Sequence, residues 1–577
     1  MGWVLDSIGA SSTTESVRGG FHHLFLAVRR MPERFAVLQN RGGLIVFQNR
    51  VAEGPSSMPP TLNVVIIKPS KYLPDGTVER FRRGFMPNST VPHLRSMVPP
   101  ELDQVPIKTF AIDEYVYSDL RYLKLLEPVR GAHTLVVLVG VQSHQFHRAL
   151  DLAALAAQNG CMAIIGGPHV MTCDTSMLQG NGVSFAQCEA ELVWSDILQD
   201  ALAGELRPLY GSGLRWQEKL ESPVLIPPNR SELARYIVPM LGVYPARGCP
   251  FLCNFCSVTM IAGRKIRSQS ISTTMASLRA AKAAGVKTIM FTSDNFNKYP
   301  QAEELLNAMV EERLGIKFFV QCDTQIGKQE ELVRLLAQAG CYQIFVGVES
   351  FDRETLVAAN KRQNRPDTYH NIVRLCREHG IGSHFSNIIG FPQDTEASVH
   401  THLDILRSIA PIWASFYILC PIPGTEQYDT FLEEGLITER NLDRFDTTCL
   451  TWRHPVFSES RISELLYECY RRFTTLGHSL HNIRKIVQTN GRGTWKEKLG
   501  SLAMSAFVRY CSWRKTHPMS GGVLRVSLDR ANEYAHLRRQ RYGFDLAPLP
   551  QSLKLLAINE SPNPRSQTVA IETNSVG

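Results

Sequence analysis

Short apolar runs rich in Val and Ile, each bounded by Gly, Pro or Ser, recur after residue 61. They are LNVVIIKPS (62–70), TLVVLVGV (134–141), MAIIGG (162–167) and GVSFAQ (182–187). Continuous apolar runs of this length are typical of buried parallel strands. The segment FHRALDLAALAAQNG (146–160) has helical spacing and ends on an Asn-Gly stop. This strand–helix–strand pattern predicts a doubly wound, Rossmann-like α/β domain over residues 61–215.

A second series of apolar runs follows a Pro-rich linker, SPVLIPPNRSEL (222–233). Its members are GVYPARG (242–248), KTIMFTS (287–293), KFFVQCD (317–323), YQIFVGVES (342–350), SHFSNIIG (383–390) and ASFYILCPIPG (414–424). Amphipathic segments such as QEELVRLLAQAG separate them. Six successive strand–helix units predict a partial (β/α)6 barrel over residues 235–440.

The remaining segments carry weaker patterns. Residues 1–60 predict an extension with one or two helices, and residues 441–555 predict a mostly helical C-terminal region. The polar stretch 556–577 is typical of disorder.

Composition narrows the class of protein. The chain has 577 residues, and no apolar run approaches the roughly 18 residues that span a bilayer. The start lacks the basic and apolar regions of a signal peptide, so we expect a cytoplasmic protein. Thirteen scattered cysteines do not form a disulfide framework pattern, and a net charge of +8 is too mild to indicate nucleic-acid binding.

Three of those cysteines lie in PARGCPFLCNFCS (245–257), where Cys249, Cys253 and Cys256 are spaced C-x3-C-x2-C. They follow the first strand of the predicted barrel, and barrel active sites are built at strand C-terminal ends. Structural zinc takes four ligands, whereas three thiolates can hold a [4Fe-4S] cluster with one open iron. Packing cysteines, or zinc completed by a distant His, remain the alternatives.

This motif resembles that of the radical S-adenosylmethionine (SAM) superfamily. The resemblance implies that the open iron chelates SAM and that Phe255 lies near its adenine. It makes Ser293, Asp294 and Asn295, in FTSDNFNK (291–298), candidates for the SAM amine. Glu349, at the end of strand four, would bond ribose, and Gly390, in IIGFPQDT (388–395), would border the adenine. Arg267 would pair with a carboxylate, since Arg offers a bidentate fork. The competing interpretations are that Asp294 and Glu349 cap strand ends and that Arg267 is a solvated side chain.

The domain in front resembles the cobalamin-binding domain of the B12-dependent radical SAM group. The resemblance rests on IKPSKYLPDG (67–76), GVQSHQFHRALDLA (140–153), IIGGPHV (164–170) and VSFAQCEAE (183–191). The candidate cobalamin-binding residues are Lys71, Gln142, Ser143, His144, Gly166, Gly167, His169, Ser184 and Glu189. The D-x-H-x2-G string of domains that ligate cobalt is absent, so we expect cobalt without a protein His ligand. A Rossmann nucleotide domain is the alternative, but the chain lacks G-x-G-x-x-G after the first strand.

Together the resemblances imply an enzyme, a cobalamin-dependent radical SAM methyltransferase acting on a carbon of a small-molecule or peptide substrate. The implied cofactors are a [4Fe-4S] cluster, SAM and cobalamin, with flavodoxin or ferredoxin as electron donor. Cobalamin would carry the methyl group, and the cluster would cleave SAM to a 5′-deoxyadenosyl radical. Oxidative cyclisation or rearrangement on the same fold is the alternative, followed by a non-catalytic corrinoid or redox sensor.

Overall fold

The computed structural model describes residues 35–40, 43–48, 61–117, 119–481, 484, 495–518 and 521–553. The chain divides into two compact units, Met1–Ser57 and Met58–Gly577. In the first unit, β1 (Phe35–Asn40) pairs antiparallel with β2 (Gly43–Gln48). The prediction of helices is wrong for these residues, which are rich in the β-branched and aromatic types that favour strands.

A seven-stranded sheet forms the first half of the second unit, in the order β10-β9-β8-β7-β3-β6-β5. All neighbouring pairs are parallel except β5–β6. The strands are β3 (Leu62–Lys68), β5 (Glu101–Leu102), β6 (Val105–Asp113), β7 (His133–Leu138), β8 (Met162–Gly166), β9 (Ser184–Ala186) and β10 (Leu209–Tyr210). This arrangement confirms the predicted doubly wound α/β fold.

Helices cover both faces of this sheet because successive side chains of a strand point to opposite sides. On β3, Val65 and Ile67 belong to the core beneath α2 (Phe146–Gln158). Val64 and Ile66 belong to a second core beneath α1 (Thr90–Ser96) and α4 (Trp194–Ala203). The helices do not cover the C-terminal ends of the strands, which face the second sheet.

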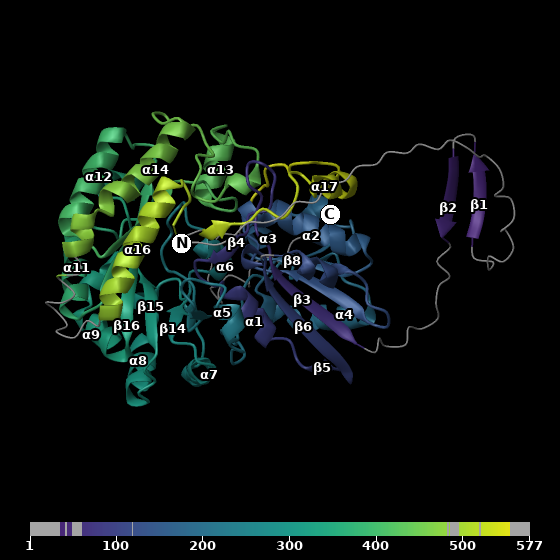
Figure 1. The fold of residues 1–577 in the computed structure, drawn as a ribbon, viewed down its shortest axis with the longest axis horizontal. Coiled ribbons are helices and arrows are strands. Elements are labelled where there is room, and N and C mark those ends of the chain that lie inside the picture. Colours follow the sequence, from purple (N-terminus) through teal and green to yellow (C-terminus); the bar gives the residue numbers. More distant parts are fainter. Residues whose placement is uncertain are drawn as a thin grey trace, which may run out of the picture. The chain divides into compact units, whose positions relative to one another are not determined.

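The second sheet has six parallel strands in the order β11-β14-β15-β16-β17-β18. They are β11 (Leu241–Val243), β14 (Thr288–Phe291), β15 (Lys317–Cys322), β16 (Cys341–Glu349), β17 (Gly382–Ile389) and β18 (Trp413–Ile418). Within the described residues β11 and β18 do not pair, so the barrel is partial, as predicted. Figure 1 shows α8 (Ala302–Glu311), α9 (Glu330–Ala339), α11 (Tyr369–Glu378) and α12 (Glu396–Ile409) along its outer side.

Two local features differ from the sequence expectation. The run 242–248 contains two strands, because β12 (Ala246–Arg247) leaves the sheet and pairs antiparallel with β13 (Arg267–Ser268). The linker at 222–233 contains a short helix, α5 (Arg230–Leu233), which Asn229 and Glu232 close with a capping box. The domain boundaries themselves stay predictions.

The region after residue 441 is mainly helical, as predicted, with α14 (Glu459–Phe473), α16 (Trp495–Trp513) and α17 (Ala535–Tyr542). A strand was missed there: β19 (Gly522–Arg525) pairs antiparallel with β4 (Phe81–Gly84). The stretch 556–577 lies outside the described residues. Among those that are described, no helix combines the length and apolar character needed to cross a membrane.

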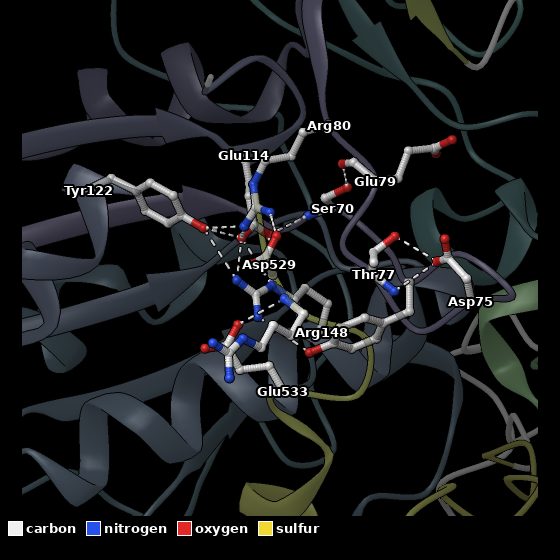
Figure 2. A network of polar contacts seen from close by, with 12 residues as sticks. Ser70, Asp75, Thr77, Glu79, Arg80, Glu114, Tyr122, Arg148, Asp529 and Glu533 are labelled. Carbon is white, nitrogen blue, oxygen red and sulfur yellow. Dashed lines mark hydrogen bonds and ion pairs between the residues drawn. The ribbon is translucent and has the colours of Figure 1, made fainter. Parts of the chain in front are cut away.

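A buried ionic network ties the end of the chain to the first sheet (Figure 2). Arg80 and Arg148 are fully buried, and both donate to Glu114, which follows β6; the Arg148 Nε to Glu114 Oε1 distance is 3.0 Å. Arg80 also pairs with Asp529, and Tyr122 donates to Glu114. Burial alone would raise the pKa of Glu114, but Arg148 and Arg80 outweigh it and lower that pKa to about 2. Each charged side chain of the network thus has a partner of opposite charge, as buried charges require.

Candidate cofactor site at the junction of the two sheets

The three motif cysteines lie in a loop that joins β12 to α6 (Val258–Ala262). Nine of the thirteen cysteines are buried, whereas Cys249, Cys253 and Cys256 are all partly exposed and free. The loop turns sharply at Gly248, where φ is +111° and an added Cβ would lie 2.5 Å from the Lys265 oxygen. The backbone N–H of Cys249 donates to the Gly263 oxygen at 3.1 Å. Glycine and this bond together hold the thiols at the start of the second sheet.

The surroundings of the thiols fit a metal cluster. Burial raises the pKa of the Cys256 thiol to about 12, and it also raises the pKa of Cys249. Such thiols lose their protons readily only to a strong positive charge, which a metal ion supplies. In the described part of the chain, no three His, Cys, Asp or Glu side chains are arranged around a single ion. In a [4Fe-4S] cluster each thiolate binds a different iron, so three thiolates suffice to hold it.

A buried ion pair lies beside the cysteine loop. Lys361 Nζ is 2.7 Å from Glu349 Oε1, and both side chains are largely buried. Glu349 ends β16 with φ of +61°, next to a register shift that re-aims the strand end. Burial lowers the pKa of Lys361, but Glu349 and the nearby Cys253 thiol outweigh it, so the pKa lies above its usual value. Lys361 also lies over the Phe255 ring, 5.6 Å from its centroid.

The end of β14 adds polar groups to the same place. Asp294 accepts from the Gly248 N–H at 2.7 Å, directly before Cys249. Asn295 donates to Asp323 Oδ2 at 2.9 Å, and its amide nitrogen lies 3.9 Å from Cys249 Sγ. Ser293, which directly precedes Asp294, is buried. The structure therefore brings the predicted β14 residues together with the cysteines.

Gly390 follows β17 in a left-handed turn with φ of +82°. Its N–H donates to Asp394 Oδ2 at 2.8 Å, and an added Cβ would lie 2.5 Å from Ile462 Cδ1. The turn requires glycine for both reasons. Phe391, which directly follows Gly390, packs edge to face against Phe255 with ring centroids 6.1 Å apart.

Arg267 and Glu189, predicted to contact different ligands, pair with each other. Arg267 donates through Nη1 to Glu189 Oε2 at 2.7 Å and through Nη2 to Oε1 at 2.8 Å. Arg247 adds bonds to Glu189 at 3.1 Å and to Glu191 at 2.7 Å. These contacts join the end of the first sheet to β12 and β13. In this structure Arg267 is therefore not a solvated side chain but forms a bidentate pair that links the two halves of the unit.

A cavity of about 260 Å³ opens between the two sheets. Its walls combine apolar residues with Gly166, Gly167 and Glu189 from the first sheet, and Tyr244, Arg247 and Asp294 from the second. Gly167 has φ of +133°, and an added Cβ would lie 2.2 Å from the Val141 nitrogen. The volume lies below the roughly 300–1,000 Å³ of typical ligand pockets, so it would take one part of a large cofactor.

The remaining cobalamin candidates lie near this edge, several of them engaged with protein groups. His169 is buried, accepts or donates at Nδ1 with Ser143 Oγ at 3.0 Å, and packs on Phe146 with centroids 4.0 Å apart. Burial and His147 lower the pKa of His169 to about 3. Ser184 is buried on β9, opposite Ile164 of β8.

His144, Gln142 and Lys71 lie where the first sheet meets the segment after β18. Gln142 is exposed and caps the turn that leads into α2. Lys71 forms an ion pair with Asp446. Burial and the Lys71 charge lower the pKa of the partly exposed His144 to about 3, so its ring is neutral near pH 7.

Sequence patterns did not single out four residues of this site: Lys361, Asp323, Arg247 and Tyr244. Asp323 follows β15 in KFFVQCD, and a strand-end carboxylate was a usable signal. Arg247 and Tyr244 lie within the first strand run and directly precede the cysteines. Lys361 follows a helix, so only the fold brings it to Glu349.

Comparison with known proteins places this geometry in a family context. Residues 243–406 match the model of the Radical SAM superfamily. The chain is 25% identical over 318 residues to bacteriochlorophyllide d C-12(1)-methyltransferase of Chlorobaculum tepidum, covering 54% of this chain and 68% of that protein. It is 27% identical over 231 residues to hopanoid C-2 methylase of Rhodopseudomonas palustris, covering 38% and 44% respectively.

Two solved structures share the fold. The methyltransferase TsrM of Kitasatospora setae, with cobalamin and a [4Fe-4S] cluster bound, superposes with a TM-score of 0.51 at 15% identity, over 66% of this chain and 79% of TsrM. The cobalamin-dependent SAM radical enzyme OxsB, with aqua-cobalamin and SAM bound, gives 0.54 at 17% identity, over 79% and 72%.

Proposed function

We propose that the chain, which belongs to the radical SAM superfamily, is a cobalamin-dependent methyltransferase that moves a methyl group from SAM to a carbon of a small molecule. The observation that carries the proposal is the position of Asp294. Its carboxylate accepts from Gly248, next to the cysteine loop, and its side chain also lines the cavity against the first sheet. One residue therefore separates the cluster site from the candidate cobalamin site.

The chain's own residues have distinct tasks in this proposal. Cys249, Cys253 and Cys256 hold the cluster, and Lys361 offsets the negative charge of the thiolates. Asn295 and Glu349 offer polar groups to SAM, while Phe255 packs against its adenine. When bound, the cluster supplies the electron that cleaves SAM, and cobalamin supplies a methyl carrier.

The first sheet would receive cobalamin at its C-terminal edge, where ligands of such folds bind. Gly166 and Gly167 allow close backbone approach, and the 260 Å³ cavity beside them takes part of the cofactor. Neither His169, which is packed on Phe146, nor His144 lies in a D-x-H-x2-G string. We therefore propose cobalt without a protein His ligand.

Small-molecule methylation is favoured by the relatives. Seven of them carry methyltransferase or methylase in their names. Two are named for a bacteriochlorophyllide and two for hopanoids. These names favour methyl transfer over oxidative cyclisation or a sensor role. A cytoplasmic location, with flavodoxin or ferredoxin as the electron donor, completes the proposal.

Anaerobic reconstitution with iron, sulfide and hydroxocobalamin tests the assignment. We expect about four irons and one cobalt per chain, with a cob(II)alamin paramagnetic resonance signal that lacks nitrogen splitting. Cys253→Ala should lose the iron and keep the cobalt, whereas Cys449→Ala, a matched partly exposed cysteine, should keep both. Iron without cobalt would leave a radical SAM protein with no methyl carrier and would overturn the methyltransferase proposal.

A further inference from the structure

A second, much larger cavity of about 1,010 Å³ lies inside the partial barrel. Three strands of the second sheet contribute mainly alternate residues to its wall, as expected for the inner face of a pleated sheet. β15 contributes Lys317, Phe319 and Gln321; β16 contributes Cys341, Gln343 and Phe345; β18 contributes Trp413, Ser415 and Tyr417. The wall of the cavity is therefore formed by the side chains of these strands that point inward.

Other segments close the side that the partial barrel leaves open. Met504 and Val508 of α16 line the cavity, together with Phe85 and Met240. Phe85 stacks on Phe507 of the same helix, with ring centroids 6.0 Å apart. The helix and the segment around β4 thus form a wall of their own, which is as apolar as the strands opposite.

The lining is uncharged over most of its area. Among the described residues that line it, none is Asp or Glu, and the charged side chains are Lys317 and Arg377. Lys317 begins β15, and Arg377 lies near the end of α11, so both belong to the end of the cavity opposite the cysteines. An apolar molecule could enter without leaving a carboxylate unpaired.

Three polar side chains in the middle of the wall form a neutral chain. The Gln343 amide nitrogen donates to His384 Nδ1 at 3.0 Å, which puts the ring proton on Nε2. Nε2 then donates to Ser415 Oγ at 2.6 Å. Burial lowers the pKa of His384 to about 3, so the ring carries no charge near pH 7. This chain suits one neutral hydroxyl or carbonyl group on a ligand.

One strand, β16, carries residues of both the cavity and the cofactor site. On β16 the inward positions run from Gln343 and Phe345 through Gly347 to Glu349. A Cβ at Gly347 would lie 2.5 Å from Glu349 Oε1 and 3.1 Å from Lys361 Nζ, so glycine makes room there for the Glu349–Lys361 ion pair. Tyr417 lines the cavity, and burial and the Glu349 charge raise the pKa of its phenol to about 12.

We propose that this cavity holds the body of the methyl acceptor: an uncharged, mainly hydrocarbon molecule, larger than an amino acid, with its reacting carbon toward Glu349. The volume is at the upper end of ligand pockets, which fits a polycyclic or long-chain substrate. This inference rests on the proposed function for the reaction, but the binding step does not depend on it.

Binding of the neutral fluorophore N-phenyl-1-naphthylamine to the full chain, loaded with hydroxocobalamin, tests the inference. We expect one site per chain and a loss of affinity of about tenfold in Met504→Trp and in Met290→Trp, since both side chains line the cavity. Leu502→Trp is the control, because residue 502 is exposed and lies about 200° around α16 from residue 504. Equal affinity in all three variants would overturn the proposal.

Competition tests the chemistry of the ligand. 1-Decanol should displace the fluorophore at a concentration about tenfold lower than decylammonium does, because the lining offers no carboxylate to a cation. Equal displacement would contradict the uncharged substrate class. Iron and cobalt contents are measured in the same samples. Normal metal loading without fluorophore binding refutes this inference alone, whereas fluorophore binding without metal loading refutes the proposed function alone.

Discussion

Lys361 places a positive charge next to Glu349 and the cysteine thiols. It lies 2.7 Å from Glu349, and both Cys253 and Cys256 influence its pKa. Three thiolates and a carboxylate in one partly buried place repel each other, so a cation among them lowers the cost of ionising the thiols. The charge also places Glu349 where it can meet a ligand.

Replacing Lys361 with Met should therefore weaken iron binding. The change leaves the Glu349 carboxylate buried without its cation, next to the thiolates. We expect iron affinity to fall by roughly tenfold, as for residues that support metal ligands. Iron content after gel filtration measures it, and Lys328→Met, at an exposed position, is the control. Unchanged iron retention in Lys361→Met would show that the lysine has no such role.

Which site residues could be predicted depends on how local their signals are. The cysteine spacing and the polar residues that end β14 and β16 are contiguous in sequence, so their type and position could be predicted. Lys361 and the Arg267–Glu189 pair depend on long-range contacts; the pair spans 78 residues. A single sequence predicts that a buried Arg will pair with a carboxylate, but the partner residue follows only from the fold.

At the scale of elements, continuous apolar runs predicted most strands of the two parallel sheets, including β3, β7, β8 and β15 to β18. β6 was missed because only Val105 and Ile112 among its residues are buried, so VPIKTFAID has no apolar run. β19 was missed for a different reason. It is a strand only because β4, more than 400 residues earlier, is there to pair with it.

The turn between β8 and α3 (Pro168–Thr172) is the element on which cobalamin binding should depend most. Gly167→Ala places a Cβ 2.2 Å from the Val141 nitrogen, at a backbone conformation open only to glycine. The turn must shift, and hydroxocobalamin affinity should fall by roughly tenfold. Titration by absorbance measures it. Gly160→Ala, at φ of +80° with open space around it, should cost about 1 kcal/mol of stability and leave affinity unchanged.

At the scale of the whole described unit, two groups of ion pairs connect the sheets and the C-terminal segment that contains Asp529 and α17. The network of Figure 2 binds Asp529 to Arg80, and Arg538 of α17 pairs with the buried Asp151 of α2 at 2.8 Å. The second group links Arg267 and Arg247 to Glu189 and Glu191. It lies directly beside the cavity of 260 Å³, so the geometry between the two cofactor sites depends on it.

A double-mutant cycle on Arg267 and Glu189 distinguishes this structural role from direct ligand binding. Each partner is nearly fully buried, so Arg267→Met or Glu189→Gln should lower the free energy of unfolding by about 3–5 kcal/mol. The double variant should lose less than the sum of the two single variants, because the two side chains share their bidentate contact. Urea unfolding measures all four proteins. If Arg267 instead pairs with the SAM carboxylate, as the family resemblance implied, Arg267→Met will weaken SAM binding in equilibrium dialysis while Glu189→Gln will not. Equal, small effects of both variants on SAM affinity would establish the link between the sheets as the role of this arginine.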